Sequence, residues 1–188
     1  MNEGAAVDYF DVLGMRRALW VSPEGVRARF QEVSREHHPD AAGGGGGYDD
    51  VVGAAAVLQD PAKRLPHWLE LHGVAYDARS TPPSAWVADE FPRVAALVHD
   101  AQQAVAKREA AGSALGKAVA SRAVVEVNDR IVGMLEQLRE RGLELDAELR
   151  AMEDAGEADV GVVSRCAVDY GFLGKWISQL RSAMASLV

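Results

Sequence analysis

Residues 22–40 read SPEGVRARFQEVSREHHPD, and this stretch decides the fold. It opens with the signals of a helix start: a serine cap, a proline in the first turn and an acidic residue at the positive end of the helix dipole. At spacings of four, three and four residues the helix then carries one apolar face, made of Val26, Phe30, Val33 and His37. The pattern predicts a long amphipathic helix that packs this face against a partner helix.

The partner follows a loop of small residues. Residues 41–47 read AAGGGGG, which have no side chains to hold a regular element and therefore separate two helices. Residues 48–58 are expected to form the second helix of an antiparallel pair, and Asp60-Pro61 to start a short helix that runs to residue 71. A short helical turn at residues 9–13 precedes the pair.

The remainder of the chain predicts a second domain. Residues 75–84 include a proline pair that cannot continue a helix, and we expect them to form a linker. Beyond it, residues 131–152 and 163–187 carry a four-three apolar rhythm. With residues 86–107 as a third segment and turns near Gly112 and Gly156, they predict a three-helix bundle over residues 85–188. The expected fold is all-α, with an N-terminal domain over residues 1–74 that consists of an antiparallel helical hairpin and short flanking helices.

Composition limits the class of protein. The 188 residues are 48% hydrophobic and 26% charged, which suits a globular protein, and the net charge of -8 argues against nucleic-acid binding, which needs clustered Lys and Arg. No apolar stretch approaches the roughly 20 residues that cross a bilayer, and the N-terminus lacks a signal core, so we expect a cytoplasmic protein that does not bind membranes. The single cysteine, Cys166, allows no intrachain disulfide and is expected to be buried.

The triplet His38-Pro39-Asp40 lies directly after the first long helix, at the mouth of the glycine loop. Proline fixes the backbone and removes an amide donor, so it holds the two flanking polar side chains in a defined turn. Residues at helical spacing from His38 share its side of the helix, away from the apolar face. They are Arg27, Gln31 and Ser34, with Arg35 beside them.

The local charge supports a docking role for the turn at His38-Pro39-Asp40. Between Met15 and His38 five arginines stand against three glutamates, a local balance of +2 inside a chain of -8. Such a patch would steer an acidic protein surface into contact. The alternative is that Arg16, Arg17 and Arg29 are an ordinary solvated surface.

The turn at His38-Pro39-Asp40 also has other interpretations. His38 is alternatively a capping or core histidine, and His37 is expected to pack in the core. A metal site made of His37, His38 and Asp40 is disfavoured, because neighbouring side chains on a helix point about 100° apart. The glycine run lacks the Lys-Ser/Thr of a phosphate-binding loop. We therefore expect no metal and no cofactor.

Three N-terminal segments and one C-terminal segment carry a resemblance to a known family. They are DYFDVLG at 8–14, RFQEVSREHHPD at 29–40, QDPAKRLPHWLELHG at 59–73 and FLGK at 172–175. In this order they resemble segments of the J-domain co-chaperones, and more narrowly of HscB, the J-protein of iron–sulfur cluster assembly. The third segment resembles the distinctive exit of the HscB J-domain.

The resemblance implies a co-chaperone that is not itself an enzyme. It implies that Asp40 engages the interdomain linker of a DnaK/HscA-type chaperone and stimulates its ATPase, that His38 supports the turn, and that the bundle delivers an iron–sulfur scaffold protein. The residues assigned to chaperone binding are His38, Pro39, Asp40, Arg27, Arg35, Gln31, Ser34 and Arg64. Those assigned to client binding are Trp86, Val87, Asp89, Phe91, Leu97 and Phe172.

A J-domain adaptor with a different client is the alternative function. Ala88, Pro92 and Arg93 replace residues that the family keeps apolar or acidic, and a proline there is expected to kink the helix or shift its start. An enzyme is the third class, which we disfavour because no nucleophile and base stand at a suggestive spacing.

Overall fold

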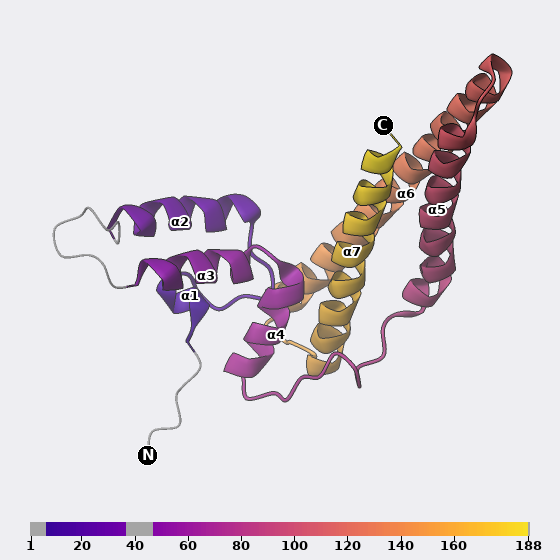
Figure 1. The fold of residues 1–188 in the computed structure, drawn as a ribbon. Coiled ribbons are helices and arrows are strands. Elements are labelled where there is room, and N and C mark those ends of the chain that lie inside the picture. The colour runs from indigo at the N-terminus through magenta and orange to yellow at the C-terminus, as the bar shows by residue number, and fades with distance from the viewer. Residues whose placement is uncertain (1–6, 37–46, 188) are drawn as a thin grey trace. The chain divides into compact units, whose positions relative to one another are not determined.

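Helices are the only regular elements in the parts of the chain that the computed structural model describes, residues 7–36 and 47–187 (Figure 1). The all-α class that the sequence predicts is thus confirmed. The helices are α1 (Tyr9–Val12), α2 (Pro23–Glu36), α3 (Tyr48–Leu58), α4 (Pro61–Leu71), α5 (Ala85–Ala110), α6 (Ala114–Ala155) and α7 (Val160–Ser186).

Helix α1 begins at a carboxylate cap. The Asp8 carboxylate accepts hydrogen bonds from the backbone N–H groups of Phe10 and Asp11, at 2.9 and 3.3 Å, and from the Arg17 guanidinium at 2.7 Å. Burial raises the pKa of the Asp8 carboxyl, but these hydrogen bonds and the Arg17 charge outweigh burial and hold that pKa below its ordinary value. The ionised carboxylate therefore stabilises the folded chain.

The Asp8 carboxylate gives a pH prediction. Because its pKa is lowered by folding, its contribution is present above the unfolded value of about 3.9 and is lost as pH falls through the lower folded value. Asp8→Asn should lower Tm by about 1–3 °C at pH 7, and this difference should vanish in increasingly acid buffer. Thermal unfolding at stepped pH measures it, with Asp49→Asn at an exposed position of α3 as the control. A difference that persists in acid would contradict this account.

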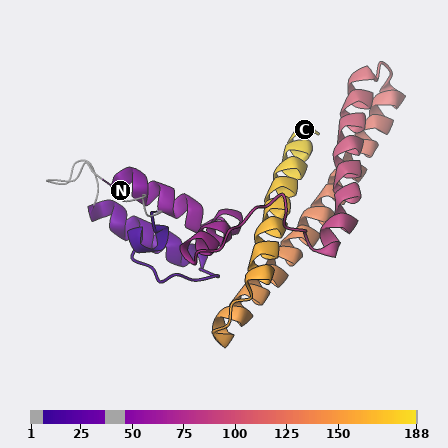
Figure 2. The same ribbon diagram turned by 90° about the horizontal axis from the view of Figure 1, so that it is seen from below.

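Helices α2 and α3 lie side by side and antiparallel (Figures 1 and 2), as the sequence predicts. Ser22 starts α2, because its Oγ accepts the Gly25 backbone N–H at 2.9 Å. The apolar face of α2 buries Val26 and Val33 and half-buries Phe30. From α3 the residues Val51, Ala54, Ala55 and Leu58 are buried. His37, the last member of the predicted stripe, lies outside the described residues.

Helix α4 connects the short N-terminal elements. It starts at the Asp60 cap, whose carboxylate accepts the Ala62 N–H at 3.0 Å, with Pro61 in the first turn. Its buried His67 accepts the Tyr9 backbone N–H on Nε2 at 3.1 Å. The imidazole thereby satisfies one of the amide groups that the start of α1 leaves without a helical partner.

Helices α5, α6 and α7 form the predicted three-helix bundle. Side-chain contacts join α6 to both of its partners: Arg130 to Asp100 of α5 at 2.8 Å, and the Gly142 carbonyl to Tyr170 Oη of α7 at 3.4 Å. At the start of α5, the fully buried Asp169 carboxylate of α7 accepts the Ser84 backbone N–H at 3.0 Å. Helix α5 continues through Pro92, so this proline does not delay its start.

Contacts divide the chain into two compact units. The first contains residues 1–82 and 146–168, and the second contains residues 83–145 and 169–188. The end of the α6–α7 hairpin thus groups with the N-terminal helices. The domain division at residues 1–74, 75–84 and 85–188, which follows the order of the chain, stays a prediction.

Within the first unit one carboxylate joins the N-terminal part to the hairpin end. Glu153 accepts the Trp20 backbone N–H at 3.1 Å and pairs with Arg16 at 3.0 Å. The Arg150 guanidinium lies over the Trp20 indole, 3.7 Å from the ring centroid, in a cation–π contact. These contacts link residues that are distant in sequence.

None of the described helices combines the length and the apolar content that spanning a bilayer requires. No group of His, Cys, Asp or Glu among the described residues is placed to hold a metal ion. Cys166 is buried, as expected.

Candidate functional site

The residues that the sequence singles out fall in two regions of the chain. The first is at the connection between α2, which ends at Glu36, and α3, which begins at Tyr48. His38, Pro39 and Asp40 lie in this connection, outside the described residues, and their predicted roles stay predictions.

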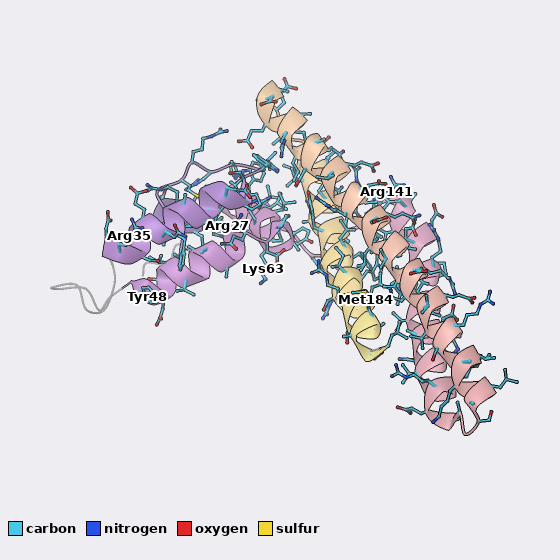
Figure 3. All side chains as sticks on the ribbon, turned by 90° about the horizontal axis from the view of Figure 1, so that it is seen from above. Arg27, Arg35, Tyr48, Lys63, Arg141 and Met184 are labelled. Carbon is cyan, nitrogen blue, oxygen red and sulfur yellow. The ribbon has the colours of Figure 1, made fainter. Side chains whose placement is uncertain are left out.

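The side of α2 that leads to the signature defines the α2 surface: Arg27, Gln31, Ser34 and Arg35. Three of these side chains are exposed, and Ser34 is half-buried. Figure 3 shows Arg35 near the end of α2 that leads to the signature, and Arg27 about two turns earlier. All four residues belong to α2 at the predicted helical spacing, and their assignment to chaperone binding stays a prediction.

Most arginines in and just before α2 pair with acidic residues. Arg27 pairs with Glu24 at 2.8 Å and Arg17 with Asp8 at 2.7 Å. Arg29 pairs with Glu32 and donates to the Leu13 carbonyl at 2.9 Å. Arg16 pairs with Glu153, as described above.

Arg35 is the contrasting case. Its side chain is exposed, and no ion pair joins it to a residue in the described part of the chain. The predicted excess of positive charge is therefore not spread evenly, because acidic residues neutralise most of these arginines. The positive charge that a docking protein can meet is concentrated at Arg35, in the last turn of α2.

Arg64 departs from its assignment to the chaperone surface. Its side chain is 2% exposed, and its guanidinium donates to the Leu58 carbonyl at 2.7 Å and to the Leu19 carbonyl at 3.2 Å. A buried side chain whose donors serve backbone carbonyls has no surface to offer a partner. Arg64 instead ties α4 to the end of α3 and to the segment that follows α1.

The second surface is an open groove of about 270 Å³ between α5 and α7. We call it the α5–α7 groove, and its lining residues are Phe91, Val94, Ala95, Val98, Phe172, Lys175, Trp176 and Gln179. Phe91 is 55% exposed, whereas Trp176 is 2% exposed and forms the floor. The ring centroids of Phe91 and Phe172 lie 6.3 and 5.5 Å from that of Trp176.

The remaining residues assigned to the client surface do not line this groove. Val87 and Leu97 are buried in the bundle core. Trp86 is half-buried, and its ring centroid lies 6.0 Å from that of Trp176 in a T-shaped arrangement. Asp89 is exposed but stands about 200° around α5 from Phe91, so it faces away from the groove.

Sequence reasoning missed Trp176 and Lys175 as members of the groove. The available signal was helical spacing, because Lys175 and Trp176 follow Phe172 by three and four residues and so share its side of α7. Only contact with α5 shows that this side is a groove.

No protein-family model matches the sequence, and no curated protein matches it. Among solved structures, the chaperone HscB from Vibrio cholerae matches with a TM-score of 0.61 and 15% identity, over 97% of this chain and 100% of that chain. The chain has the HscB fold.

The HscB fold explains why certain segments of the sequence resemble that family. In DYFDVLG, Asp8 caps α1 and Phe10 is fully buried. In the segment at 59–73, Asp60 starts α4 while Arg64 and His67 satisfy buried backbone groups. Much of the resemblance therefore consists of residues that build the HscB fold.

Proposed function

We propose that the chain is a J-domain co-chaperone of the HscB type. Its His38-Pro39-Asp40 signature stimulates the ATPase of a DnaK/HscA-type chaperone, and its helical bundle delivers an iron–sulfur cluster scaffold protein to that chaperone, in the cytoplasm. The chain itself catalyses no reaction. The observation that carries the proposal is the placement of the signature between the antiparallel α2 and α3 of an HscB fold that extends over nearly the whole chain.

On the chaperone side, the α2 surface supports the proposal. Arg35 lies in the last turn of α2, three residues before His38, and its charge is not taken up by a described carboxylate. A cation beside the signature accelerates encounter with an acidic chaperone surface. Arg27 contributes less, because Glu24 neutralises it.

On the client side, the α5–α7 groove supports the proposal. Phe91 and Phe172 present aromatic surface around the buried Trp176. Exposed aromatic side chains around a pocket are typical anchors of protein interfaces, where a few such residues carry most of the binding energy.

A binding experiment separates this proposal from an adaptor with another client. The chain is immobilised and exposed to the iron–sulfur scaffold protein of the same cell, alone and together with the chaperone and ATP. We expect the scaffold to bind the immobilised chain and to pass to the chaperone when ATP is present. Chaperone capture without any scaffold capture would contradict the client assignment and favour the adaptor.

A further inference from the structure

The α5–α7 groove has one charged residue among its eight lining residues, Lys175 of α7. Its other lining residues are aromatic, aliphatic or, in Gln179, uncharged. A lysine in such a position lays its methylene stem along apolar surface and keeps its ammonium in water. Lys175 is exposed, so its ammonium is available at the rim of the groove.

The charge of Lys175 is not balanced within the bundle as that of Arg93 in α5 is. Arg93 binds both carboxylate oxygens of Glu90 at 2.7 and 2.8 Å and the side chain of Gln137 at 3.1 Å. No ion pair joins Lys175 to any residue of the described chain, although the protein carries a net charge of -8. An apolar groove with one unneutralised cation on its rim is complementary to an apolar group beside an anion.

We propose that the occupant of the α5–α7 groove is a client segment in which an aspartate or glutamate stands beside an apolar side chain. The apolar side chain packs between Phe91 and Phe172, and the carboxylate pairs with Lys175. This inference rests on the proposed delivery function and adds the chemistry that the client must present. The apolar contact supplies most of the residence time, and Lys175 supplies steering and register.

The two contributions differ in the rate constant that they set, because rim charges act mainly on association and buried anchors mainly on dissociation. The association and dissociation rates of the scaffold protein are therefore measured with wild-type chain, Lys175→Glu and Phe172→Ala at low and high salt. Lys117→Glu is the matched control, because it makes the same charge change at an exposed position of α6 that does not line the groove. Circular dichroism confirms that each variant is folded.

At low salt we expect Lys175→Glu to slow association about five- to tenfold, with the difference shrinking at high salt. Phe172→Ala should mainly speed dissociation, and Lys117→Glu should associate like wild type. Replacing acidic residues of the scaffold with lysine one at a time should reveal one position that restores binding to Lys175→Glu and to no other variant.

Three outcomes overturn the inference. If Lys175→Glu associates like wild type while Phe172→Ala weakens binding, the groove binds the client but the acidic partner does not exist. If Lys117→Glu slows association as much as Lys175→Glu, net charge rather than the groove cation is responsible. If the wild-type chain does not bind the scaffold, the proposed delivery function fails, and the inference fails with it.

Discussion

Replacing Asp40 with asparagine should abolish stimulation of the chaperone ATPase. Asparagine keeps the size of the side chain and removes its charge, so a charge-assisted contact with the chaperone is lost. Removing one partner of a desolvated charge pair typically costs about 2–5 kcal/mol, which corresponds to roughly 30-fold or more in affinity. At the co-chaperone concentration that gives half of the wild-type effect, the rate with Asp40→Asn should therefore stay close to the basal value.

Phosphate release by the chaperone, measured at increasing concentrations of the co-chaperone, tests this result. Asp50→Asn is the control, because it makes the same change at an exposed position in the first turn of α3. Asp50→Asn should stimulate like wild type. Equal stimulation by Asp40→Asn would show that the signature does not act through its carboxylate.

Replacing Arg64 with alanine should destabilise the chain strongly. The buried guanidinium donates to the Leu58 and Leu19 carbonyls, and its loss leaves both acceptors buried without this donor. Hydrogen bonds from a charged group contribute about 1.5–3 kcal/mol each, so we expect the free energy of unfolding to fall by about 3–5 kcal/mol. Arg64→Lys should also destabilise, because an ammonium lacks the fork that reaches two carbonyls.

Urea unfolding followed by circular dichroism measures the effect of these changes. Lys63→Ala is the matched control at the preceding position (labelled in Figure 3), since Lys63 is exposed and only pairs with Asp60 at 3.6 Å. That change should lower the free energy of unfolding by no more than about 1 kcal/mol. Similar values for the alanine variants of Arg64 and Lys63 would contradict the structural role of Arg64.

The helices were predictable because their ends carry local signals. Ser22-Pro23, Asp60-Pro61 and Gly156 mark helix ends in the sequence, and the structure has the corresponding boundaries. Capping depends on residues within one turn, so it requires no knowledge of the rest of the fold. The pairing of α2 with α3 followed from their apolar faces and the short connection between them.

The contacts between distant segments were not predictable in the same way. The resemblance assigned Arg64 to chaperone binding, and only the positions of the Leu19 and Leu58 carbonyls explain its burial. The pairing of Glu153 with Arg16 depends likewise on two segments that meet only in the folded chain.

The candidate client surface was predicted in part for a related reason. Phe91 and Phe172 do line one groove, whereas Val87 and Leu97 face the core. Membership of a resembling segment does not tell which side of a helix faces solvent. Helical spacing sorts the residues by side, but only the packing of α5 against α7 shows which side forms the groove.

The most direct test of whether the chaperone binds at the connection between α2 and α3 is hydrogen–deuterium exchange of the chain, with and without the ATP-bound chaperone. We predict slower exchange in peptides that cover α2 and the start of α3 when the chaperone binds, and unchanged exchange in α6. Slower exchange confined to α5 and α7, with α2 unchanged, would contradict the account, because the chaperone would then bind the helices assigned to the client.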